Sequence, residues 1–157
     1  MKKTEHTVGK ELKHIPERHE VPAEDTWDLS GLFASDEVWN ETLGEYGKMI
    51  ERLPSFRGTL ARSAESLAGW LDFSRDLDIL SERIAAYAYA RHSEDERCME
   101  TRAMTEKYAM ASAKSQADGA WADPEILEIP EADIIKFQCM RGTVRALTRS
   151  AITANRV

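Results

Sequence analysis

The sequence of 157 residues has little cysteine and no long apolar run. Its two cysteines, Cys98 and Cys139, form neither a CxxC motif nor a disulfide framework. No stretch free of Asp, Glu, Lys and Arg approaches the roughly 20 apolar residues that a membrane-spanning helix needs. The polar N-terminal region lacks the apolar core of a secretory signal. We therefore expect a soluble, cytoplasmic protein without a membrane partner.

The chain also lacks an excess of positive charge. Lys and Arg total 21 against 28 for Asp and Glu, which gives a net charge of −7. An acidic chain repels phosphate, so the balance argues against nucleic acid as a partner. Residues 139–157 differ, because they contain no Asp or Glu and carry Arg141, Arg145, Arg149 and Arg156. Four arginines among small residues are a weak nucleic-acid signal, and we predict no such binding.

No alternating run of β-branched residues predicts a strand, and the 8 glycines and 5 prolines fall between helical patterns. The predicted fold is all-α, an antiparallel helical bundle or set of hairpins. We divide the chain into an extended polar arm (1–25), a helical lobe (26–138) and an irregular basic tail (139–157). The cluster of Trp27, Leu29, Leu32 and Phe33 is predicted to anchor the entering chain against the core.

The spacing of apolar residues predicts a first helix capped by Ser35 or Asp36 and ended by Pro54. Ser63 is expected to cap a second helix of roughly 28 residues that ends at the turn 92–95. Its Tyr87 and Tyr89 point to two faces, so one should be core and the other should line a groove or interface.

A third helix is predicted from a stripe that combines Met104, Tyr108, Ala111 and Ser115. Pro124 is predicted as the first residue of a short turn or helix. A further helix is expected to start over 131–137.

No pattern of residues specifies a catalytic or metal site. His19-Glu20 begins like the zinc motif HExxH, but Ala23 replaces the second histidine and Pro22 would break the helix. Three of the four histidines, His6, His14 and His19, lie in the polar arm and are interpreted as solvated surface residues. His92 follows the long helix at its C-terminal end, where a cation is favoured by the helix dipole. Ser63 and Ser66 fit helix caps, and the acidic runs 94–96 and 128–133 fit solvated turns. We predict no catalytic, metal-binding or cofactor-binding residue.

Several motifs nevertheless follow the order found in one known family. They are Glu20-Val21-Pro22, Thr26-Trp27-Asp28-Leu29-Ser30-Gly31-Leu32-Phe33, Phe56-Arg57-Gly58-Thr59-Leu60, Tyr87-Ala88-Tyr89-Ala90 before Ser93-Glu94-Asp95, and Asp123-Pro124-Glu125-Ile126-Leu127. From about Glu20 to about Phe137 the chain resembles the N-terminal region of the oligoendopeptidase F family of zinc metallopeptidases.

The resemblance implies a helical lobe beside a catalytic domain that cleaves short peptides with zinc held by HExxH and a later glutamate. Because this chain contains none of those ligands, we expect no cofactor in it and no activity of the lobe alone. Its implied partner is the missing catalytic domain, and oligopeptides would bind only to the full-length enzyme. The alternative is a stand-alone helical interaction module without catalysis, with self-association through exposed apolar surface. The change near Gln138 suggests a frame change or premature end, with a natural shortened paralogue as the alternative.

Overall fold

The computed structural model describes residues 18–137, and within them it contains helices and turns but no strand. The all-α prediction is confirmed. Two short 3-10 turns come first, and four helices and another 3-10 turn follow. They are η1 (Arg18–Glu20), η2 (Ala23–Asp25), α1 (Asp36–Ile50), η3 (Leu53–Phe56), α2 (Ala64–Glu94), α3 (Met99–Gly119) and α4 (Ala122–Leu127). Residues 131–137 are also helical, as predicted.

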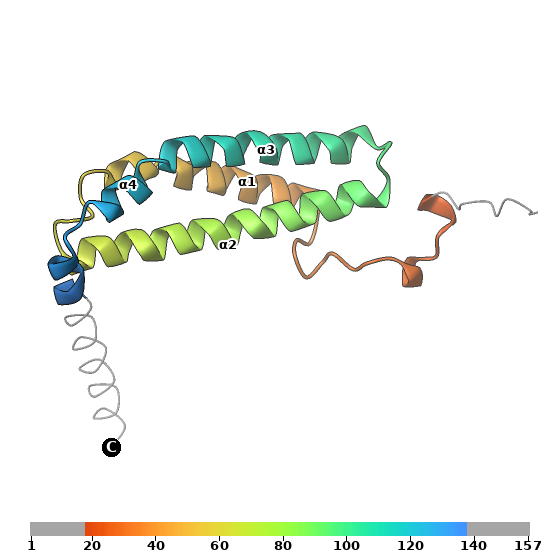
Figure 1. Ribbon diagram of the computed structural model, residues 1–157. Coiled ribbons are helices and arrows are strands. Elements are labelled where there is room, and N and C mark those ends of the chain that lie inside the picture. The colour runs from red at the N-terminus through yellow and green to blue at the C-terminus, as the bar shows by residue number, and fades with distance from the viewer. Residues whose placement is uncertain (1–17, 138–157) are drawn as a thin grey trace, which may run out of the picture.

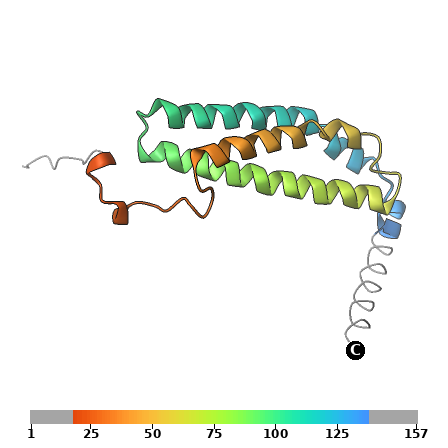
Figure 2. The same ribbon diagram turned by 180° about the vertical axis from the view of Figure 1, so that it is seen from behind.

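The long helix α2 organises the bundle. Figure 1 shows α1 and α3 lying along it, both running antiparallel to α2, and the view from behind in Figure 2 agrees. The short helix α4 lies at the end of the bundle where α2 begins. This is the predicted antiparallel arrangement, and it leaves one side of α2 facing solvent.

Local capping explains where α1 and α2 begin. Ser35 caps α1, and its Oγ accepts a hydrogen bond from the Val38 backbone N–H at 3.4 Å. Ser63 caps α2, and its Oγ accepts from the Ser66 N–H at 3.1 Å. Before α2 the chain turns through Gly58, whose φ of +74° is open to glycine but strained for other residues.

The core fills the space between the three long helices. Its most deeply buried large side chains are Trp39, Tyr46, Ile50, Leu53, Leu60 and Ile84. Aromatic rings extend it toward α4, where Trp70 contacts both Phe56 and Trp121 with ring centroids 5.5 and 5.0 Å apart. Burial on this scale is the main source of stability in a bundle of this size.

Some side chains lie where the sequence pattern did not predict. Trp27 is 76% exposed and does not anchor the chain; Phe33 is buried, because the turn from Leu29 to Phe33 faces the core and Trp27 lies before it. The apolar spacing of α2 predicts a buried face that includes Leu71, but Leu71 is exposed and Phe73, which that spacing omits, is buried. Pro124 is the third residue of α4 and not the first, since the helix already begins at Ala122.

The predicted tail 139–157 and the arm up to residue 17 lie outside the described residues, together with His6, His14, Cys139 and the four tail arginines. Residues 18–25, the described part of the predicted arm, form the two 3-10 turns.

Candidate functional site

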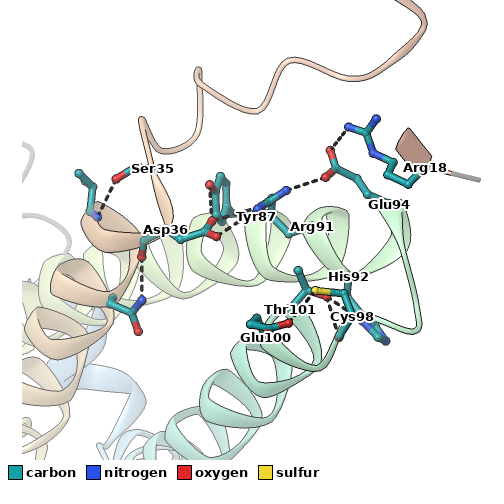
Figure 3. A network of polar contacts seen from close by, with 12 residues as sticks. Arg18, Ser35, Asp36, Tyr87, Arg91, His92, Glu94, Cys98, Glu100 and Thr101 are labelled. Carbon is teal, nitrogen blue, oxygen red and sulfur yellow. Dashed lines mark hydrogen bonds and ion pairs between the residues drawn. The ribbon is translucent and has the colours of Figure 1, made fainter. Parts of the chain in front are cut away.

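The residues that carry reactive groups in the sequence do not converge. Among residues 18–137 no group of three or more His, Cys, Asp or Glu side chains could hold a metal ion. At the α2–α3 turn the His92 Nδ1 lies 3.4 Å from the Thr101 hydroxyl (Figure 3). The Cys98 thiol donates to Glu100 at 3.2 Å. Both contacts are local and link no further chemistry.

The serines and acidic runs serve turns and helix ends. Ser63 and Ser66 form the α2 cap, as predicted. Asp95 accepts a hydrogen bond from the Arg97 N–H at 3.0 Å, which shapes the turn between α2 and α3. In the second run, Asp133 pairs with Lys136 at 2.8 Å. The described residues thus provide no set of ligands for the zinc that the resemblance implies.

A network of charged side chains joins the start of α1 to the end of α2 (Figure 3). Arg91 donates to both carboxylate oxygens of Asp36, at 3.2 Å from Nε and 3.1 Å from Nη2, which is a bidentate geometry. The Tyr87 hydroxyl donates to the same carboxylate at 2.8 Å. Arg91 also donates to Glu94 at 2.7 Å, and Glu94 pairs with Arg18 at 3.5 Å. We call these five residues the arm clamp.

The arm clamp is electrostatically stable. The Arg91 guanidinium holds the pKa of Asp36 below its usual value, and the Asp36 carboxylate in turn raises the pKa of Arg91. Burial, with the hydrogen bond to Asp36, raises the pKa of Tyr87 to about 12. These shifts keep Asp36, Tyr87 and Arg91 each in one protonation state at neutral pH, so the three groups position segments of chain and are not prepared for proton transfer.

The arm clamp borders a cavity of about 230 Å³ between the N-terminal segment and the end of α2. Its lining comes from both segments: Arg18, Asp25, Thr26, Trp27, Ala90, Ser93 and Glu94. The Arg18–Glu94 pair and the exposed Trp27 both line this cavity, so the pair links the N-terminal segment to α2 beside the indole.

A second polar link fixes the opposite end of the bundle. The Glu125 carboxylate of α4 accepts hydrogen bonds from the Gly58 N–H at 2.7 Å and the Leu60 N–H at 2.9 Å. Burial acts to raise the pKa of Glu125, but these N–H donors outweigh it and the pKa is lowered. We call this contact the α4 clamp.

Large apolar side chains are exposed on every helix and, at Trp27, in the segment before α1. They are Trp27, Val38, Leu71, Ile79, Tyr89, Met99, Met110, Leu127 and Ile135. On α2, Leu71 and Ile79 are eight residues apart, about 80° around an α-helix, so they lie on adjoining exposed faces. The ring of Tyr89 packs edge-on against Tyr108 of α3, with the centroids 6.2 Å apart. Tyr87 is buried and Tyr89 is half exposed, which confirms the prediction that the two tyrosines serve different faces. No helix within residues 18–137 is long and apolar enough to cross a membrane.

Sequence reasoning missed both clamps. Asp36 was expected only near a helix N-terminus, and Arg91 was not singled out, because 55 residues separate them and no local spacing signals the pair. Glu125 was noted only within the Asp123–Leu127 corner. Its partners Gly58 and Leu60 are backbone groups, which leave no mark in a sequence.

Comparison with known proteins finds two relatives. The chain is 31% identical over 128 residues to Oligopeptidase PepF of Bacillus subtilis (strain 168), covering 82% of this chain. It is 27% identical over 124 residues to Group B oligopeptidase PepB of Streptococcus agalactiae serotype III (strain NEM316), covering 79% of this chain. No family model and no solved structure matches it.

The two alignments cover most of this chain but little of the relatives. The chain spans only 19% of the first relative and 20% of the second. Both relatives are oligopeptidases by name. The chain is therefore related to the oligoendopeptidase F family over about four fifths of its length.

Proposed function

We propose that this chain forms a helical lobe of an oligoendopeptidase F-like zinc peptidase and is inactive by itself. The observation that carries the proposal is the similarity to two oligopeptidases over about four fifths of this chain but one fifth of theirs. In this proposal the remaining four fifths holds the zinc and cleaves short peptides in the cytoplasm.

The arrangement of side chains supports a lobe more than an independent catalyst. The arm clamp and the α4 clamp hold the two ends of the bundle. In the arm clamp the charged side chains bind one another, and in the α4 clamp the carboxylate binds backbone N–H groups. Exposed Leu71 and Ile79 on the free side of α2 offer apolar area to a neighbouring domain. We infer that this side of α2 packs against the catalytic part.

Peptide hydrolysis tests the inactive part of the proposal. The purified 157-residue chain is incubated with a quenched fluorescent peptide, with added zinc and with a chelator. We expect no hydrolysis above the rate in buffer. Hydrolysis that the chelator abolishes and zinc restores would show that the chain holds its own catalytic site.

A graft tests the role as a lobe. The matched fifth of the Bacillus subtilis relative is replaced by this chain, and the control is a graft that carries Leu71→Glu and Ile79→Glu. We expect the graft to cleave the peptide and the double variant to lose at least tenfold in kcat/KM. A soluble, helical graft without activity would contradict the proposal, and equal activity of both grafts would contradict the assignment of the α2 face.

The exposed apolar side chains also favour a second candidate, a stand-alone helical module that associates with itself. Sedimentation of the purified chain over a hundredfold range of concentration separates the two. A stable dimer in which Leu71→Glu restores the monomer would favour the module, and a monomer throughout would exclude self-association.

A further inference from the structure

A groove crosses the junction of α2, α3 and α4, on a part of the molecule that neither clamp uses. It has a volume of about 360 Å³. Leu53, Trp70 and Leu77 form its apolar floor, and all three are buried. The groove exists because α3 ends in small residues, among them Ser115 and Gly119, which leave the space beside the floor unfilled.

Two carboxylates border this floor. Asp78 comes from the middle of α2 and Asp123 from α4, and both are exposed. Several acidic side chains near helix ends in this bundle form ion pairs, as Asp118 does with Lys114 and Asp36 with Arg91. Within residues 18–137, by contrast, neither Asp78 nor Asp123 forms an ion pair or a hydrogen bond. The groove therefore combines apolar area with negative charge that the described residues leave uncompensated.

This combination matches one class of side chain. Lysine and arginine place an aliphatic stem on apolar surface and extend a cationic head toward solvent and carboxylates. An acidic or purely apolar residue would lose one of the two contributions. The described part of the chain has about twice as many acidic as basic residues, so its field also attracts a cationic ligand.

We propose that the groove binds the lysine or arginine side chain of a short peptide, with its stem on Leu53 and Leu77 and its charge between Asp78 and Asp123. That the carrier is a short peptide rests on the proposed function, since both relatives are oligopeptidases by name. The complementarity to a cationic side chain rests on the groove alone. The groove then gives the lobe a preference for basic peptides.

Nuclear magnetic resonance titration of the 157-residue chain tests this. The ligand is a blocked pentapeptide of alanines with a central lysine, and the matched ligand has norleucine in its place. We expect saturable shifts at the Trp70 indole N–H and the Gly119 amide, with the norleucine peptide at least about fivefold weaker, as for a partly exposed charge pair. Equal affinity for the two peptides, or no saturation, would overturn the proposal.

Charge variants provide the second arm. Asp78→Asn with Asp123→Asn should weaken lysine-peptide binding about fivefold. The control, Glu82→Gln with Glu128→Gln, removes two charges that do not line the groove and should bind like the unmodified chain. If the two double variants weaken binding equally, the effect comes from overall charge and the proposed site is wrong. Because the readout is binding, its failure would leave the hydrolysis and graft results standing.

Discussion

The indole of Trp39 donates a hydrogen bond through Nε1 to the Ile84 carbonyl at 2.9 Å, across 45 residues of sequence. Both side chains are fully buried. The bond connects the first turn of α1 to the interior of α2. It satisfies a polar group that would otherwise be costly to bury and sets the position of α1 along α2.

Replacing Trp39 should therefore be among the most damaging single changes. Trp39→Phe removes the donor and leaves part of the indole volume empty, and we expect the free energy of unfolding to fall by about 2–3 kcal/mol. Urea denaturation followed by circular dichroism measures it. Tyr89→Phe, a change on a half-exposed ring, is the control and should stay within about 0.5 kcal/mol. A small effect of Trp39→Phe would show that α1 is positioned by other contacts.

Tyr87 makes stability depend on alkaline pH. Its pKa is about 12 in the folded chain, above the value of about 10 expected when unfolded. Folding thus favours the neutral phenol, so this contribution is complete below pH 10 and is lost as the pH rises through 12. Phenolate absorbance of the chain and of Tyr87→Phe should differ by one ionisation near pH 12. If Tyr87→Phe instead lacks an ionisation near pH 10, Tyr87 ionises like an exposed tyrosine. That result would contradict its hydrogen bond to Asp36.

The α4 clamp should respond to acid and to substitution. Because the pKa of Glu125 is lowered, its contribution is present above the unfolded value of about 4.3 and is lost as the pH falls through the folded value. Glu125→Ala should speed amide hydrogen exchange at Gly58 and Leu60 by about tenfold, the loss of about one hydrogen bond. Glu128→Gln leaves the clamp intact and should leave both rates unchanged. Unchanged exchange in Glu125→Ala would exclude the carboxylate as the acceptor.

Two glycines should respond in opposite directions to the same change. Gly58 has a φ of +74°, so Gly58→Ala forces a side chain into a strained conformation and should cost about 1 kcal/mol. Gly44 lies inside α1 with open space where a Cβ would point, and Gly44→Ala should stabilise by about 0.5–1 kcal/mol. Thermal unfolding of both variants measures the contrast, and a shift of the same sign would contradict the assigned backbone conformations.

The elements that local physics determines were predictable from the sequence. Ser63 was identified as a cap, and Ser35 as one of two candidates beside Asp36, because a polar side chain before an apolar-periodic segment satisfies free N–H groups. The end of α2 and the helix over 131–137 follow from the same kind of signal.

Properties that depend on distant partners were not predictable. The exposure of Trp27 depends on where the chain passes the end of α2, and an apolar cluster alone does not indicate it. The Asp36–Arg91 pair and the Glu125 contacts join segments 55 to 67 residues apart. For the same reason the carboxylates of the groove, Asp78 and Asp123, appeared in the sequence as ordinary surface charges.

The length of α2 has a thermodynamic consequence. Its 31 residues extend about 46 Å. The α4 clamp holds the loop that precedes the helix, and the arm clamp includes Tyr87, Arg91 and Glu94 near its end. Groups separated by such a rigid rod share no contacts, so free energies lost at the two ends should simply add. The N-terminal segment and its exposed indole can therefore detach from the end of α2 while the groove, whose α2 lining runs from Trp70 to Asp78, keeps its shape. Substitutions at one end of the helix should therefore leave contacts at the other end unchanged.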